Sequence, residues 1–116
     1  MTLPAQHSGL SKERWATFDL NRQILMIANE MNRCTARIRA GDDEGARRCY
    51  ERVLNLADLT IAVHGRRPLR RELLRWRDVA ALLYLQEDDR AENHRRALEV
   101  LLRFTPEASR QIPHLL

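Results

Sequence analysis

The sequence predicts an all-α fold, an up-down-up-down four-helix bundle with a short fifth helix at the C-terminal end. Apolar residues recur in steps of three and four through most of the 116 residues, which is the spacing of one face of an α-helix. The chain has only 4 glycines and 4 prolines, and several of them fall between the periodic segments. Because the connections are only a few residues long, successive helices are expected to pack antiparallel.

The first long helix is expected over residues 20–38, where apolar side chains recur in steps of four and three. This stripe consists of Leu20, Ile24, Ile27, Met31, Cys34 and Ile38. Gly41 follows as a C-cap, since glycine adopts the left-handed backbone without a clash at Cβ. Asp42 and Asp43 then offer carboxylate oxygens to the start of the next helix, and Glu44 lies where the helix dipole favours an anion.

The second helix is expected over residues 43–64, where two adjacent apolar stripes cover about half of the circumference. The stripes consist of Ala46, Cys49, Val53, Leu56, Thr60 and Val63, and of Tyr50, Leu54, Ala57 and Ile61. A helix with so wide an apolar face is predicted to pack on more than one neighbour. Gly65 ends this helix, and Pro68 fits the first turn of the third, where its missing N–H would have had no partner.

The third helix is expected over residues 67–85 and has apolar residues on every side. Its core stripe consists of Leu69, Leu73, Trp76, Ala80 and Leu83. Its far face mixes apolar with charged residues, namely Leu74, Ala81, Leu82 and Leu85 with Arg71, Arg75 and Asp78. This distribution indicates that the helix is buried against a further surface.

The fourth helix is expected over residues 90–104. Its apolar side consists of Ala91, His94, Leu98, Leu101 and Leu102, flanked by Ala97 and Phe104. Asp89 and Glu92 have the spacing of a capping box at its start. Thr105 and Pro106 can cap the short fifth helix, which is expected to end before Pro113.

The length and composition fit a single helical-bundle domain, predicted over residues 13–112, with a flexible N-terminal tail over 1–12 and a C-terminal tail over 113–116. Hydrophobic residues make up 44% of the chain, but charges interrupt them every few positions, so no membrane span is expected. The N-terminal residues lack the charged head and apolar run of a secretory signal. Two cysteines are too few for a disulfide framework. We therefore expect a cytoplasmic protein.

We find no motif for a metal, a cofactor or a catalytic group. Di-iron bundles use Glu-x-x-His pairs, and none of His64, His94 and His114 has a glutamate three positions earlier. P-loop glycines, Cys-x-x-Cys and His-Glu-x-x-His are absent as well. No catalytic residue, metal ligand or cofactor is assigned, so an enzyme is the less favoured class. Such residues can still converge from different helices, which a linear search does not detect.

Two cysteines and one histidine each have two interpretations. Cys34 lies seven residues before Gly41 and Cys49 eight after it, so an antiparallel hairpin brings the two thiols close together. They are either small apolar residues of the helix seam, or a redox pair or half of a metal site. His94 lies near the apolar side of its helix and is either a hydrogen-bonded structural residue or a general base.

The segment GRRPLRRELLRWRD, residues 65–78, carries a cluster of six arginines. The basic cluster consists of Arg66, Arg67, Arg70, Arg71, Arg75 and Arg77. Subtracting Glu72 and Asp78 leaves a charge of +4, equal to the net charge of the whole chain. This surplus indicates a site for nucleic acid or another polyanion. Trp76 lies on the core stripe, however, so the cluster lacks an aromatic platform for bases.

The apolar residues on the far face of the third helix predict self-association as a homodimer. The expected interface consists of Leu74, Asp78, Ala81, Leu82 and Leu85. A two-fold contact requires only one self-complementary patch, and the stems of neighbouring arginines can cover apolar surface. The alternative is that this helix lies deeper in the bundle and packs against three neighbours.

Two resemblances bear on function. Residues 41–58, GDDEGARRCYERVLNLAD, resemble the second helix of a tetratricopeptide repeat, which implies a solenoid-like peptide binder, although no second copy follows at the ~34-residue period. The plan of a long helical hairpin, two further helices and a short fifth resembles the HEPN group of prokaryotic toxin systems, which implies RNA or nucleotide association. The Arg-to-His spacing of that group's nuclease motif is not matched, since Arg90–His94 and Arg110–His114 each enclose only three residues.

From these observations we expect a non-catalytic helical-bundle interaction module, an adaptor or regulator that forms a homodimer and can engage a protein partner. The first alternative is an RNA- or nucleotide-associated, HEPN-like domain that contacts phosphates through the basic cluster. The second is a peptide binder of the tetratricopeptide type.

Overall fold

The computed structural model describes residues 11–86 and 89–116, and within these ranges it contains helices and no strand. The helices are α1 (Lys12–Trp15), α2 (Leu20–Arg39), α3 (Asp43–Val63), α4 (Arg67–Leu85), α5 (Arg90–Leu102), α6 (Pro106–Ser109) and α7 (Ile112–Leu115). The four long helices, α2 to α5, are those that the apolar periodicity predicts. Their bounds differ from the expected ones by no more than two residues.

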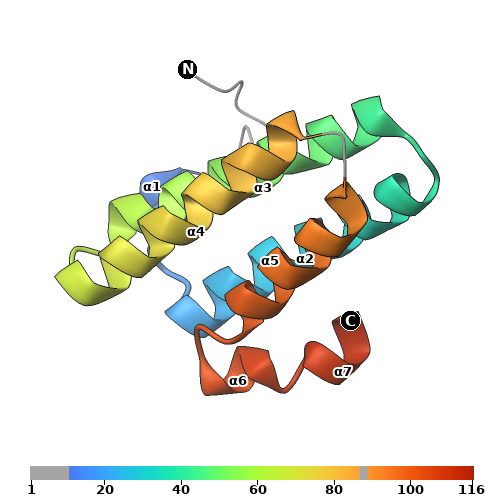
Figure 1. The fold of residues 1–116 in the computed structure, drawn as a ribbon. Coiled ribbons are helices and arrows are strands. Elements are labelled where there is room, and N and C mark those ends of the chain that lie inside the picture. Colours follow the sequence, from blue (N-terminus) through green and yellow to red (C-terminus); the bar gives the residue numbers. More distant parts are fainter. Residues whose placement is uncertain (1–10, 87–88) are drawn as a thin grey trace.

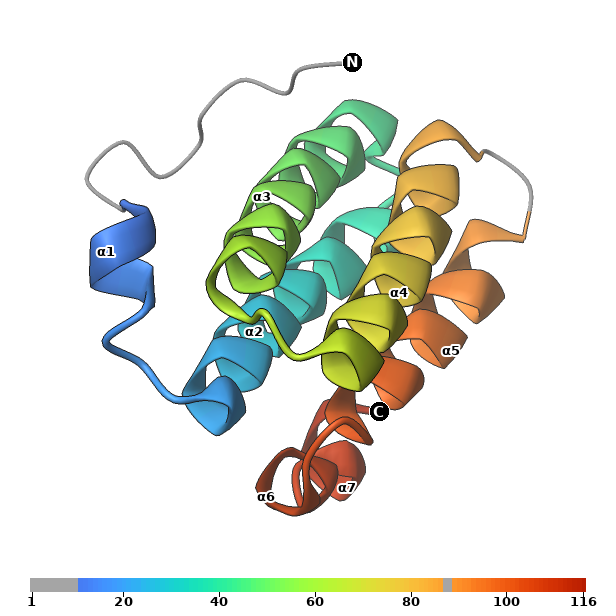
Figure 2. The same cartoon turned by 90° about the vertical axis from the view of Figure 1, so that its left-hand side faces the viewer.

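The four long helices form the predicted bundle. Helix α2 packs against α3, α3 against α4, and α5 closes the arrangement by packing against both α2 and α4. Figures 1 and 2 show the helices as neighbouring rods joined by short connections, with α6 and α7 at the α2–α5 side. Helix α3, which carries the tetratricopeptide-like stretch, is one of the bundle helices and also contacts α1.

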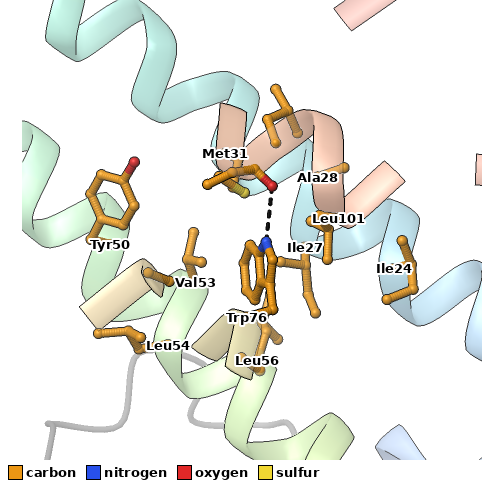
Figure 3. Close-up of a cluster of buried hydrophobic side chains, with 14 of the residues drawn as sticks. Ile24, Ile27, Ala28, Met31, Tyr50, Val53, Leu54, Leu56, Trp76 and Leu101 are labelled. Atoms are coloured by element: carbon orange, nitrogen blue, oxygen red, sulfur yellow. Dashed lines mark hydrogen bonds between the residues drawn. The ribbon is translucent and has the colours of Figure 1, made fainter. Parts of the chain in front are cut away.

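The core lies between the four helices and is built mainly from the predicted apolar stripes (Figure 3). Trp15 of α1 and Ala108 of α6, which belong to no predicted stripe, extend it. Its fully or almost fully buried side chains include Ile24, Ile27, Met31, Tyr50, Val53, Leu54, Leu83, Leu98 and Leu101. Trp76 of α4 is also buried, and its Nε1 donates to the carbonyl oxygen of Ala97 on α5 at 2.9 Å. This bond satisfies the polar atom of the indole and holds α4 beside α5. The ring is therefore part of the core and offers no stacking surface.

The α2–α3 turn has the caps that the sequence predicts. Gly41 has φ +70°, the left-handed conformation that ends a helix without a Cβ clash. Oδ1 of Asp42 accepts from the backbone N–H of Gly45 at 2.9 Å and so caps α3. A Cβ built on Gly45 would lie 2.2 Å from Oδ2 of Asp42, so a larger residue there would displace the capping carboxylate.

The prediction of a capping box at the start of α5 is wrong. Asp89 is the N-cap residue, but its φ is +52° and its side chain makes no capping hydrogen bond. A side-chain cap requires an extended backbone at this position, from which the carboxylate reaches the first N–H groups of the helix. The left-handed conformation of Asp89 removes that reach.

Both ends of the described chain are more helical than expected. Residues 1–10 of the predicted N-terminal tail lie outside the described residues, whereas α1 begins at Lys12 and buries Trp15 completely. The expected fifth helix is divided into α6, which Thr105 caps as predicted, and α7. Pro113 lies within the first turn of α7, where proline costs no hydrogen bond, and does not follow the end of a helix.

Candidate interaction surface

The outward face of α4 carries most of the large apolar side chains that the described residues expose. These exposed side chains are Leu74, Val79, Leu82, Leu85, Val100 and Leu116. Four of the six belong to α4, and Val100 of α5 lines the same groove as Val79 and Leu82. Scattered apolar residues are normal on protein surfaces, whereas a concentration of this kind is typical of a binding surface.

The five residues predicted for the dimer interface lie on one side of α4. Leu82 is 66% exposed, Leu85 68% and Leu74 43%, and at about 100° per residue these three project within about 80° of one another. Asp78 is exposed among them, while Ala81 is half-buried at the edge of the core. Helix α4 packs against α3 and α5, and this face stays in contact with solvent.

A groove of about 400 Å³ borders this face, between α4 and α5. Its lining includes the buried residues Trp76, Leu83 and Ala97 and the exposed residues Val79, Leu82 and Val100. Sequence reasoning assigned Val79 and Val100 to no surface. Each is an isolated apolar residue in its own helix, and their common location is evident only when α4 and α5 lie side by side.

Two of the six arginines of the basic cluster form ion pairs with carboxylates of the protein itself. Nη1 of Arg75 lies 2.8 Å from Oε1 of Glu72, one turn earlier on α4. Nε of Arg77 lies 3.0 Å from Oδ1 of Asp58 on α3. These ion pairs neutralise two of the positive charges, so both guanidinium groups are less available to a polyanion, and the Arg77–Asp58 pair also joins α4 to α3.

The other four arginines of the cluster lie close to the start of α4. Arg70 donates to a backbone carbonyl of α3 at 3.4 Å. Arg66, Arg67 and Arg71 are exposed, and no ion pair involves them within residues 11–86 and 89–116. The structure thus divides the predicted polyanion site, leaving three arginines available at one end of the helix.

A hydrogen-bonded network is buried where α2, α3 and α5 meet. His94 is 3% exposed, its Nε2 lies 2.9 Å from Oγ1 of Thr35, and its Nδ1 bonds the hydroxyl of Tyr50. The Thr35 hydroxyl donates to the carbonyl of Met31 at 3.2 Å, so it accepts from Nε2–H, and Tyr50 then donates to Nδ1. Burial lowers the pKa of His94 to about 4. A neutral ring with both nitrogens bonded fits the structural interpretation of this residue.

Cys34 and Cys49 are neighbours in the α2–α3 seam, as predicted, and both are buried free thiols. Burial, followed by the adjacent Cys49, raises the pKa of the Cys34 thiol. Nη2 of Arg52 donates to Sγ of Cys49 at 3.0 Å, and Nε of the same arginine pairs with Oε2 of Glu30 at 3.1 Å. No spacing pattern in the sequence indicates this Glu30–Arg52 contact, which joins α2 to α3. A buried, protonated Cys34 is a poor nucleophile, which favours the packing interpretation of the pair.

The described part of the chain offers no grouping of three or more His, Cys, Asp or Glu side chains that could hold a metal ion. Among the helices of that part, none has both the length and the apolar character that a membrane crossing requires. Comparisons with protein-family models, with curated proteins and with solved structures give no match for this chain.

Proposed function

We propose that this chain is a cytoplasmic, non-catalytic interaction module, an adaptor or regulator that forms a homodimer through the outward face of α4. One observation carries the proposal: the α4 patch, defined as Leu74, Val79, Leu82 and Leu85, holds four of the six large apolar side chains that are exposed among residues 11–86 and 89–116. Covering apolar surface stabilises an association by about 25 cal/mol per Å² before its entropic cost. The two buried free thiols suit a reducing compartment.

A second copy of the chain fits this face. If two α4 helices pair antiparallel about a two-fold axis at Asp78, Leu74 of one copy lies opposite Leu82 of the other, because both residues are equidistant from Asp78. Arg71 lies two turns before Asp78 on the same side of the helix, is exposed and makes no ion pair in the described structure. Its positive charge would offset the proximity of the two Asp78 carboxylates. The patch is therefore self-complementary, as a two-fold contact requires.

The first prediction concerns Leu82, the centre of the patch. Leu82→Glu is expected to weaken self-association by at least about ten-fold, because a carboxylate buried without a partner costs more than 1.4 kcal/mol. Sedimentation velocity over a range of protein concentrations measures the change. The parent should shift from monomer to dimer as the concentration rises, and the variant should stay monomeric over the same range.

The matched control is Asn29→Glu, which adds the same charge at an exposed position of α2. This variant should dimerise like the parent. A parent that is monomeric at every concentration, or a Leu82→Glu variant that associates as strongly as the parent, would contradict the proposal.

A second candidate function is the binding of RNA or another polyanion by the start of α4. The observation that favours it is the group of three exposed arginines without an ion pair in the described structure, Arg66, Arg67 and Arg71. We expect retention on heparin at low salt that is lost at moderate salt, since phosphate-type contacts release counterions. Replacing all three arginines with serine should move elution to a clearly lower salt concentration.

The control for this experiment replaces Arg14, Arg48 and Arg96 with serine, which removes the same number of charges from exposed positions elsewhere. If both triple variants elute together, retention reflects net charge and not a site. No retention of the parent at low salt would exclude this candidate.

A further inference from the structure

A cavity of about 240 Å³ lies where the end of α2, the first part of α5 and the C-terminal residues meet. Its apolar lining consists of Ile38, Ala91, Leu98, Leu115 and Leu116. Figure 1 shows α7 on the α2 and α5 side of the bundle, away from α3 and α4. The cavity is therefore separate from the α4 patch and from the groove beside it.

Two arginines at this cavity are available to an anion. Arg39 is the last residue of α2 and Arg95 lies on α5, and both line the cavity with exposed side chains. Over the ranges that the structure covers, neither takes part in an ion pair. Glu92 also lines the cavity, but its Oε1 pairs with Nε of Arg96 at 3.2 Å. The cavity thus combines surplus positive charge with an apolar lining.

Two polar side chains at this cavity, those of Thr35 and His94, determine which end of a ligand faces outward. Thr35 and His94 line the cavity, yet the Thr35 hydroxyl proton already goes to the carbonyl of Met31 and the Nε2 proton of His94 to Thr35. Neither group has a proton left for an anionic head. Among the side chains that line the cavity, only the two exposed arginines can donate to a carboxylate or phosphate, so we place the head at the arginines and the apolar part of the ligand along Ile38 and Leu98.

We propose that this cavity binds a small amphipathic anion, a molecule with a carboxylate or phosphate head held by Arg39 and Arg95 and a short apolar tail held by the apolar lining. Charge-assisted hydrogen bonds from two guanidinium groups give selectivity for the head, and burial of the tail contributes affinity. The proposal does not rest on dimer formation, because the residues of the cavity lie outside α4.

The test compares four probes with the same six-carbon tail: hexanoate, hexyl phosphate, hexylammonium and hexanol. Binding to the full chain is followed by calorimetry and by amide and side-chain NMR shifts. We expect hexanoate or hexyl phosphate to bind about ten-fold more tightly than hexylammonium and hexanol, with shifts at Thr35, Leu98 and Arg95. Preference for one of the two anions identifies the head group as carboxylate or phosphate.

Variants locate the site. Arg39→Gln and Arg95→Gln are each expected to weaken binding of the preferred anion by about ten-fold, whereas Arg103→Gln, at an exposed position near the end of α5, should not change it. Ala91→Phe should block the cavity and abolish binding. Thermal unfolding and sedimentation of each variant verify that folding and self-association match those of the parent.

Three outcomes would overturn the proposal. The first is that neither anion binds at millimolar concentration. The second is that hexanol binds as well as the anions and the arginine variants leave binding unchanged, which indicates apolar partitioning only. The third is that the NMR shifts locate the probe in the α4–α5 groove.

Discussion

Replacing Trp15 with alanine is expected to lower the free energy of unfolding by about 3–5 kcal/mol, the usual cost of truncating a buried aromatic side chain. The indole is 0% exposed, although α1 has only four residues. Its Nε1 donates to Oγ1 of Thr60 on α3 at 3.0 Å, and the backbone carbonyl of Trp15 accepts from Nε2 of Gln23 at 3.0 Å. Removing the ring leaves a cavity between α1 and α3. Urea unfolding followed by circular dichroism measures the loss.

The Trp15→Phe variant separates packing from hydrogen bonding. In the parent the ring centroids of Trp15 and Phe18 lie 5.8 Å apart in an edge-to-face contact. Phenylalanine at position 15 keeps an aromatic ring and much of the apolar surface, but it cannot donate to Thr60. We expect this variant to lose about 1–2 kcal/mol. If the alanine variant instead loses less than about 1 kcal/mol, then α1 does not pack on the bundle in solution as described.

The second large effect is a loss of stability in mild acid that originates at His94. Burial lowers the pKa of this ring to about 4 from its ordinary value of 6.5, so the unfolded chain binds a proton more readily than the folded one. The stabilising contribution is therefore complete above pH 6.5 and is lost as the pH falls toward 4. The linkage predicts that the free energy of unfolding falls by about 2 kcal/mol between pH 7 and pH 5.

The control for the acid effect is His94→Gln, which removes the titrating group and keeps a polar side chain next to Tyr50 and Thr35. Carboxylates of the protein titrate equally in both forms, so the parent should lose about 2 kcal/mol more than the variant over this interval. An NMR titration of the His94 ring in the parent provides a direct measurement. A midpoint near 6.5, or equal losses in parent and variant, would show that the ring is not buried in the network.

Much of the fold could be predicted because helix limits depend on residues that are close along the chain. The third predicted helix, 67–85, coincides with α4 (Arg67–Leu85). Gly41 ends α2 through its own backbone conformation, and Thr105 caps α6 through a bond to Ala108, three residues later. The apolar periodicity likewise identifies the buried side of each helix, because side chains one turn apart share a face.

The predictions that failed or were missing have two different causes. At Asp89 the left-handed backbone overrides the local capping preference. Trp15 lies in a helix too short to show periodicity, and its burial depends on Thr60, 45 positions away. A spacing rule does not detect such partners.

The candidate surfaces likewise combine features that one helix predicts with features that depend on how two helices pack. The leucines on the outward side of α4 were evident from the sequence, because they lie opposite the core stripe of a single helix. The location of Val100 beside them, and of Arg39 beside Arg95, requires two helices to be placed against each other. The apolar face of a single helix was therefore predictable, whereas the residues that line a groove between two helices were not.

By itself the sequence determined the four long helices, their order, their buried sides and the apolar excess on α4. The tertiary structure alone decided that Tyr50, Thr35 and His94 meet in one network, although 44 and 59 positions separate His94 from its two partners. The physical reason is that helix formation depends on interactions within a few turns of the chain. Contacts across the bundle depend on the relative position and rotation of whole helices, which the packing of the complete core determines.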